Sequence, residues 1–293
     1  MSDNNDSHLL ELLCKRENLE VLDDLIEKTE VRKNLLVPVQ SEKLLRNHDY
    51  SRDLIEIAQF SNEFFEIEET QLPTLRAKCW KDFGLFGKII YYSPLIVSAL
   101  TASSGALVDF SSPKEIIAYS LLAIASPIIL FIGNRTRDRH FRGPAYQNRI
   151  KTVFLSPLDL QSINIFDLAH EYTHYLLREK RPLESHLATS EGLCNGFARQ
   201  FARNYSTTYN DQTPEYQTER AHLFYLRRTR KWLERFFEGK EKLKVHKGPC
   251  GFTEKMTLHI LGSALFDIAQ SRYGPNIYKD VFNGKVDLTT VLT

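Results

Sequence analysis

The sequence predicts an α+β protein that is mainly helical and contains a small sheet. Apolar residues recur at three-and-four spacing over most of the chain, whereas residues 150–155 form a β-branched, apolar run typical of a strand. Two further runs, residues 89–108 and 116–134, contain no charged side chain. We therefore expect three regions: an N-terminal helical region (1–85), a transmembrane helical hairpin (86–134) and a C-terminal domain (135–293).

The N-terminal region contains two segments with the apolar spacing of amphipathic helices. They cover residues 9–30 and 50–69, and acidic and basic side chains occupy the positions between the apolar ones. No motif in residues 1–85 indicates a chemical role. The pattern predicts packing helices, and it leaves the role of this region unassigned.

The two uncharged runs predict a pair of membrane-spanning helices. A helix of about 20 apolar residues crosses the hydrocarbon layer, and a short polar connection at residues 109–115 would join the pair. Basic residues, including Lys88 and Arg135, flank the pair, whereas the connection carries only Lys114. Since cytoplasmic flanks are enriched in Lys and Arg, we expect a multi-pass protein in the lipid bilayer with both termini and the C-terminal domain in the cytoplasm.

The most specific motif is His-Glu-Tyr-Thr-His at residues 170–174, inside an apolar run with helical spacing. His170 and His174 would lie one turn apart on the same helix face, where two imidazoles can bind one Zn²⁺. Glu171 would then reach a water at the metal and accept its proton. The motif therefore predicts a catalytic zinc site.

A catalytic zinc needs a third protein ligand, and Glu191 is the best candidate. Ser190 has the character of an N-cap, which would place Glu191 in the first turn of a second helix. Asn195 would follow on the same helix face and could hydrogen-bond a ligand imidazole. Glu184 and His186, in a segment that we expect to be a loop, are the rival ligands.

These residues resemble the gluzincin metallopeptidases, and most closely the peptidase-MA-like domains, in which H-E-x-x-H is followed by E-G-L-A. The matching positions here are residues 170–174 and 190–193. The resemblance implies a compact zincin-like domain with two roughly antiparallel helices and a small sheet. It also implies that Glu171 is both general base and general acid. Asn195 stands where many relatives carry aspartate, and the G-x-M-E-N signature of gluzincin aminopeptidases is absent from the sequence.

A donor to the oxyanion of the tetrahedral intermediate should come from further along the chain. Residues 257–266 have helical spacing, and their His-x-x-Gly-Ser pattern is similar to the helix that supplies a histidine in thermolysin-like relatives. That similarity implies a catalytic role for His259. Tyr225 and Tyr273 are the alternatives.

Together these features predict a membrane-tethered, zinc-dependent metalloendopeptidase that hydrolyses a peptide or protein substrate on the cytoplasmic side. The alternatives are a catalytically silent zinc-binding membrane protein that binds a partner, and a soluble gluzincin with buried apolar helices. The four cysteines form no C-x-x-C pair, so a reducing compartment is the simpler inference. With a net charge of +1 and no nucleic-acid motif, a nucleic-acid partner is not expected; the sequence does not indicate an oligomeric state.

Overall fold

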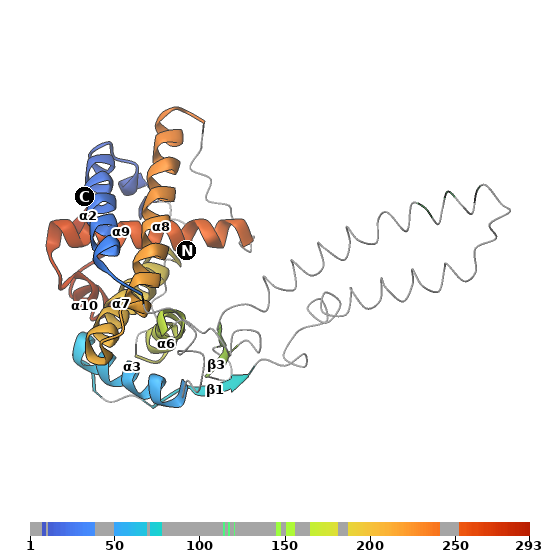
Figure 1. The fold of residues 1–293 in the computed structure, drawn as a ribbon. Coiled ribbons are helices and arrows are strands. Elements are labelled where there is room, and N and C mark those ends of the chain that lie inside the picture. Colours follow the sequence, from blue (N-terminus) through green and yellow to red (C-terminus); the bar gives the residue numbers. More distant parts are fainter. Residues whose placement is uncertain are drawn as a thin grey trace. The chain divides into compact units, whose positions relative to one another are not determined.

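The computed structural model is drawn as a ribbon in Figure 1. It describes residues 8–9, 11–38, 50–68, 71–77, 114, 117, 120, 145–147, 151–155, 165–180, 187–240 and 252–293. The chain divides into two compact units. The first contains residues 1–75, 145–153 and 163–293, so the N-terminal helices belong to the same unit as the helix with the H-E-x-x-H motif. The second contains residues 76–144 and 154–162.

The fold is mainly helical with a small sheet, as the sequence predicts. Its helices are α2 (Glu17–Leu35), α3 (Tyr50–Phe65), α6 (Ile165–Lys180), α7 (Leu187–Tyr209), α8 (Thr213–Phe237), α9 (Phe252–Tyr273), α10 (Ile277–Phe282) and α11 (Leu288–Leu292). Among the described residues, the sheet contains β1 (Thr74–Ala77), β2 (Ala145–Gln147) and β3 (Thr152–Leu155), in the order β1-β3-β2. The predicted strand at 150–155 corresponds to β3, whereas the sequence pattern did not indicate β1 or β2.

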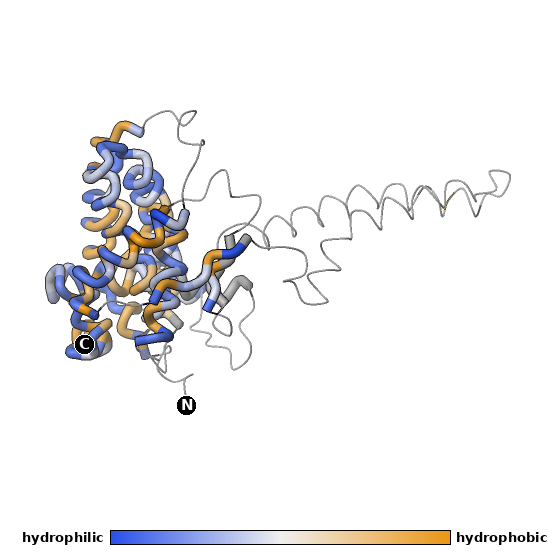
Figure 2. Tube along the Cα trace, turned by 90° about the horizontal axis from the view of Figure 1, so that it is seen from below, coloured by the Kyte–Doolittle hydropathy of each residue, from blue (hydrophilic) through white to orange (hydrophobic). Residues whose placement is uncertain are grey.

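Helix α7 lies at the centre of the helical unit and packs against α6, α8 and α9. It buries Leu193, Phe197 and Phe201 almost completely. The Phe197 ring stacks on Phe65 of α3 at 5.2 Å between ring centroids, and Phe65 stacks on Phe282 of α10 at 4.1 Å. Figure 2 shows hydrophobic and hydrophilic residues alternating along these helices, as expected for helices that bury one face.

Glycines allow α7 and α9 to cross in close contact. A Cβ on Gly192 would lie 2.4 Å from the carbonyl oxygen of Gly262, and a Cβ on Gly262 would lie 2.3 Å from the carbonyl oxygen of Ala188. Neither backbone could approach so closely with a larger residue at these two positions. The crossing matters for the site because Glu191 is adjacent to Gly192 on α7.

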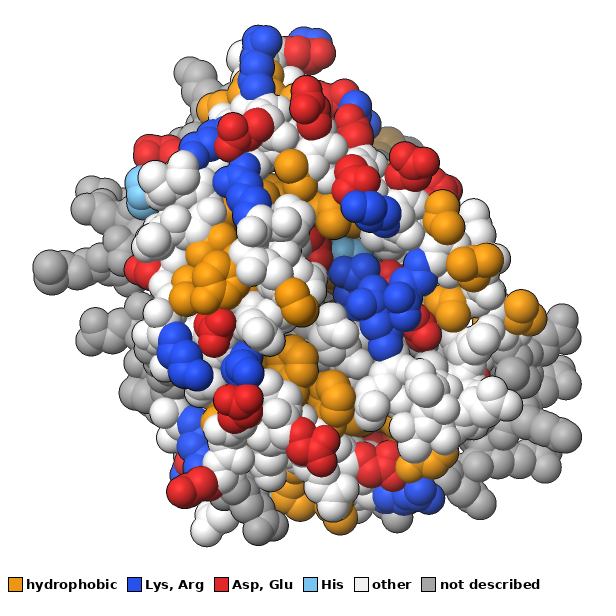
Figure 3. All heavy atoms as spheres, turned by 90° about the vertical axis from the view of Figure 1, so that its left-hand side faces the viewer, with side chains coloured by type: hydrophobic (Ala, Val, Ile, Leu, Met, Phe, Trp, Pro, Cys, Tyr) orange, Lys and Arg blue, Asp and Glu red, His pale blue; other side chains and the backbone are white. Residues whose placement is uncertain are grey.

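Ion pairs connect α2 to α8. Glu30 accepts from Arg227 at 2.8 Å, and Asp23 pairs with Arg230. The helix that the sequence predicts at residues 9–30 is interrupted, since α2 begins at Glu17 and the Asn18 side chain donates to the carbonyl oxygens of Leu12 and Leu13. On the face drawn in Figure 3, acidic and basic side chains are interspersed, in keeping with the small net charge.

The predicted membrane localisation requires correction. No helix in the part of the chain that the structure describes combines the length and the apolar character needed to cross a membrane. The physical reason is visible in α8, a 25-residue helix in which arginine, lysine and glutamate recur along the length. This finding overturns the prediction of a two-span membrane protein with a cytoplasmic zinc site. The two uncharged runs that suggested the hairpin, residues 89–108 and 116–134, lie outside the described residues except for Ile117 and Ser120.

Candidate metal centre

The histidines of the H-E-x-x-H motif both lie on α6, which covers the whole motif as predicted. Leu168, Tyr172 and Leu176 are fully buried on this helix and fix its rotation against the core. His170 and His174 are separated by one turn and therefore point the same way. Their Nε2 atoms lie 3.1 Å apart.

Glu191 brings a carboxylate from α7 to the two imidazoles. Its Oε2 lies 3.3 Å from His170 Nε2 and 3.4 Å from His174 Nε2. The side chain of Glu191 is only 8% exposed, so these contacts are shielded from solvent. Three donor atoms from two helices thus form a nearly equilateral triangle with edges of 3.1, 3.3 and 3.4 Å.

Cys194 approaches the same site from the other edge of an imidazole. Its Sγ lies 3.4 Å from Nδ1 of His174, whereas Glu191 contacts Nε2 of that ring. His170, His174 and Cys194 form a group that could hold a metal ion, with ligand atoms all within 4.8 Å of one another. Two sets of three residues are therefore available, one completed by Glu191 and one by Cys194.

The Glu191 set fits the geometry of zinc more closely. A tetrahedral Zn²⁺ with bonds of about 2.0–2.1 Å holds nitrogen and oxygen ligands about 3.3–3.4 Å apart. Two edges of the triangle of His170, His174 and Glu191, at 3.3 and 3.4 Å, have this spacing, and the third, between the two imidazoles, is shorter at 3.1 Å. Since the two nitrogens of an imidazole point in divergent directions, an ion at His174 Nε2 leaves Nδ1–H to donate to Cys194 Sγ.

The electrostatics of the site reflect these contacts. Burial opposes the charged form of His174, but Cys194 and Glu191 outweigh that effect and raise its pKa well above the ordinary value. The pKa of the Cys194 thiol is raised to about 11, mainly by burial. His174 opposes this increase, whereas the carboxylates of Glu191 and Glu171 add to it. Glu171, on the same helix as the two histidines, thus contributes to the electrostatics around Cys194.

A line of polar residues continues from Glu191 along the buried side of α7. Asn195, one turn on, donates from Nδ2 to the Ser263 hydroxyl of α9 at 2.7 Å. Arg199 and Arg203 follow at the next two turns. The predicted hydrogen bond from Asn195 to a ligand imidazole stays a prediction, while its contact with Ser263 ties α7 to α9 below the metal centre.

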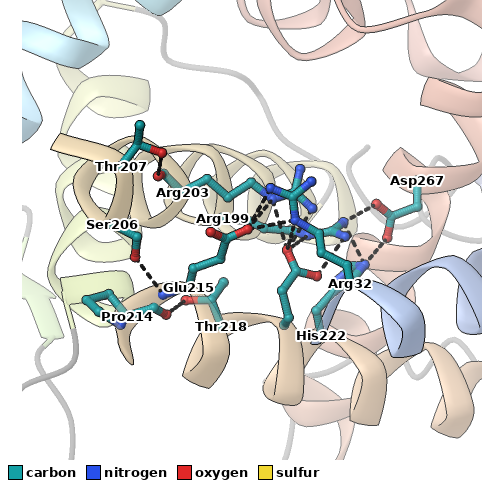
Figure 4. A network of polar contacts seen from close by, with 11 residues as sticks. Arg32, Arg199, Arg203, Ser206, Thr207, Pro214, Glu215, Thr218, His222 and Asp267 are labelled. Atoms are coloured by element: carbon teal, nitrogen blue, oxygen red, sulfur yellow. Dashed lines mark hydrogen bonds and ion pairs between the residues drawn. The ribbon is translucent and has the colours of Figure 1, made fainter. Parts of the chain in front are cut away.

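Arg199 and Arg203 belong to a buried network of polar contacts, which is drawn in Figure 4. Arg199 contacts Glu219 at 3.0 Å and Asp267 at 3.1 Å, and Arg203 contacts Glu219 at 2.6 Å. His222 Nε2 lies 3.0 Å from Asp267. Burial opposes the charged form of Glu219, but Arg199 and Arg203 outweigh it and lower its pKa to about 2. The network connects α7, α8 and α9 and so holds the helix that carries Glu191.

The candidate oxyanion donors differ in their surroundings. His259 lies within α9, but its side chain is outside the described residues. Burial raises the pKa of Tyr225 on α8, and the carboxylates of Asp167 and Glu191 raise it further. The Tyr273 hydroxyl instead donates to Asp280 at 3.1 Å, and the ring is 45% exposed.

Two other sequence predictions have clear outcomes. Ser190 is not an N-cap, because α7 begins at Leu187 and places Ser190 inside the helix. Glu184 and His186, the rival ligands, lie outside the described residues. From the sequence, the place of Cys194 three residues after Glu191 allowed a position near the site but favoured a small core residue; the structure shows that Cys194 is buried and contacts His174.

Comparison with known proteins adds no relative: no protein-family model, curated protein or solved structure matches this chain. The chemistry of the site must therefore be argued from its own residues.

Proposed function

We propose that this chain is a zinc-dependent metallopeptidase that hydrolyses peptide bonds within a peptide or protein substrate. In the proposed site, His170, His174 and Glu191 bind Zn²⁺. The observation that carries the proposal is the triangle of their donor atoms, with edges of 3.1, 3.3 and 3.4 Å. Two imidazoles and one carboxylate form the ligand set of many catalytic zinc sites, in which the fourth position is left for water.

Glu171 supplies the acid–base chemistry in this proposal. It is half-buried and lies next to His170 on α6, so its carboxylate can reach the open side of the site. When bound, zinc would lower the pKa of a water and polarise the substrate carbonyl. Glu171 accepts the proton of that water and then transfers it to the leaving amine. A purely structural zinc site would have no use for such a carboxylate beside three ligands.

Cys194 is assigned a positioning role at the metal rather than a place among its ligands. The thiol contacts the Nδ1 edge of His174, the edge that a metal at Nε2 leaves open to a hydrogen-bond partner. That contact would fix the orientation of the ring. The assignment also explains why a buried sulfur and a buried carboxylate can both contact one imidazole, each on its own edge.

The donor to the oxyanion is assigned to α9 or α8. His259 is the donor that the gluzincin resemblance implies, and Tyr225 is the alternative, whose pKa is raised in part by Glu191. Removal of one oxyanion donor lowers kcat roughly 10²- to 10³-fold. We expect that loss for His259→Ala. If His259→Ala is silent and Tyr225→Phe shows the loss, the role belongs to Tyr225.

Activity of the Glu171→Gln variant tests the proposal. We expect wild-type protein to cleave peptides in a diverse library and Glu171→Gln to lose roughly 10²- to 10⁴-fold in rate while keeping its zinc, because an amide cannot accept the proton. Glu179→Gln is the matched control, since Glu179 lies on the same helix and pairs with Lys151. Equal activity in Glu171→Gln and wild type, or zinc binding without any hydrolysis by wild type, would contradict the proposal.

A further inference from the structure

A pocket lined by basic side chains lies between α2 and α8, and no role has yet been assigned to it. Its volume is about 410 Å³. The lining residues on α8 recur at the spacing of one helix face, and one residue of α2 completes the pocket. They are Lys33, Arg220, Leu223, Phe224, Arg227, Arg228 and Lys231. No acidic side chain is among the described residues that line it.

Most of the basic side chains in this pocket have no acidic partner among the residues that the structure describes. Of the lining cations, Arg227 forms an ion pair, with Glu30 of α2 at 2.8 Å. Arg230 of α8, which lies outside the pocket, is paired with Asp23. Within the described part of the chain, Lys33, Arg220, Arg228 and Lys231 have no acidic partner, so the pocket concentrates four uncompensated cations.

Arg228 stacks over an aromatic ring on the same helix face. Its guanidinium carbon lies 5.1 Å from the centroid of Phe224, which is 47% exposed. Stacking on the ring leaves the N–H groups at the edge of the guanidinium available to an acceptor. An anion that binds here would therefore meet an arginine that is already oriented, which reduces the entropy lost on binding.

We propose that this pocket binds the phosphate groups of a polyphosphorylated ligand, either free or as the headgroup of a lipid. Arginine matches phosphate with two parallel hydrogen bonds, and lysine adds point charge. The row from Arg220 to Lys231 extends for about 16 Å along the helix, which is longer than one phosphate requires. The volume of about 410 Å³ falls within the range of small-ligand pockets.

An acidic peptide is the less favoured occupant. Side chains on one face of an extended strand recur about every 6.6–6.8 Å, so a peptide would bring only two or three carboxylates, each of charge −1, to this row. Phosphate groups carry more charge in less space. The proposal is independent of the metal centre, because none of the lining residues is a ligand or an acid–base group of the proposed peptidase.

Binding of inorganic tripolyphosphate to the full chain, measured by calorimetry, tests the proposal. We expect the Arg220→Glu/Lys231→Glu double variant to bind at least about tenfold more weakly, because two attractive charges become repulsive. Arg235→Glu, on the same helix outside the pocket, should change the affinity less than about twofold. All three proteins keep the metal centre, so chelation of metal by the probe affects them equally, and thermal unfolding checks that each is folded.

Two further arms identify the source of the phosphates. Phosphatidylcholine vesicles with and without phosphatidylinositol 4,5-bisphosphate report on a lipid headgroup, and poly-glutamate reports on an acidic peptide. Binding of tripolyphosphate alone supports a free ligand, whereas binding of the phosphoinositide vesicles as well supports a headgroup. The proposal is overturned if tripolyphosphate does not bind, or if Arg235→Glu weakens its binding as much as the double variant does. It is also overturned if poly-glutamate binds as tightly as tripolyphosphate.

Discussion

Cys194 Sγ lies 3.4 Å from Nδ1 of His174, on the opposite edge of the ring from the Glu191 carboxylate. One imidazole is therefore contacted on both of its nitrogens, by a thiol and by a carboxylate. In the proposed site, Glu191 lies at Nε2 of His174, where the ion would bind, and Cys194 lies at Nδ1. This arrangement makes the two contacts separable by mutation.

The ligand assignment predicts the spectrum of the cobalt-substituted protein. With His170, His174 and Glu191 as ligands, Co²⁺ should show no sulfur-to-cobalt charge-transfer band in the near ultraviolet, because no thiolate is bound to the metal. The measurement is an absorption spectrum of wild type and Cys194→Ser loaded with cobalt. A strong band in wild type that disappears in Cys194→Ser would assign the sulfur as a ligand instead.

Zinc affinity should separate Glu191 from Cys194. Glu191→Ala removes a ligand and should weaken zinc binding at least about 100-fold, whereas Cys194→Ser removes a positioning contact and should cost about tenfold. Competition with a chelator of known affinity measures both. The order of the two effects is the test, and a larger loss in Cys194→Ser than in Glu191→Ala would reverse the assignment.

The contact between α7 and α9 predicts a specific loss of stability in Gly192→Ala. The added Cβ would lie 2.4 Å from the Gly262 carbonyl oxygen and 2.5 Å from the Phe266 ring, so the helices must separate. We expect the free energy of unfolding to fall by about 1–3 kcal/mol, as for other overpacked cores. Denaturant titration measures it.

Gly239→Ala is the control for that substitution. Nothing lies within 4 Å of a Cβ at Gly239, although its φ of +71° is unfavourable for alanine. Its cost should therefore be about 1–2 kcal/mol, without movement of α7 or loss of zinc affinity. A Gly192→Ala protein with wild-type stability and zinc affinity would show that the crossing is looser than described.

The low pKa of Glu219 predicts acid sensitivity. Because Arg199 and Arg203 hold this pKa at about 2, below the ordinary value of 4.5, the carboxylate stabilises the fold fully above about pH 4.5. The stabilisation, roughly 3 kcal/mol, is lost as the pH falls from 4.5 towards 2. Denaturant titrations of wild type at several pH values should show this loss. Glu219→Gln should be less stable than wild type at pH 7, and its free energy of unfolding should fall less on acidification. If the free energy of unfolding has the same pH dependence in both proteins, Glu219 is not the source of the acid sensitivity.

Much of the metal centre could be predicted from sequence because its residues lie on two helices with strong periodicity. The spacing of His170 and His174 fixes a shared helix face, and Glu191 lies on a second amphipathic helix. The structure brings the side chains of His170, His174 and Glu191 within 3.4 Å of one another. Ser190 was misjudged because residues before it, including the fully buried Ala188, extend α7 towards its N-terminus.

Contacts that depend on tertiary packing could not be read from the sequence. Arg199, Glu219 and Asp267 come from three helices, and no local pattern pairs them. The same holds for α2, whose periodicity indicates a buried face without showing that α8 covers it. The membrane prediction rested on the absence of charge in two runs, whereas none of the helices that the structure describes is long and apolar enough to cross a membrane.

The zinc content of the purified chain tests the central claim most directly. Wild type should contain about one Zn²⁺ per chain, and His170→Ala and His174→Ala should each lose it, because a site with three protein ligands cannot spare one. His8→Ala, a control at an exposed histidine, should retain the metal. Zinc-free wild type, or full zinc occupancy in both His170→Ala and His174→Ala, would contradict the account.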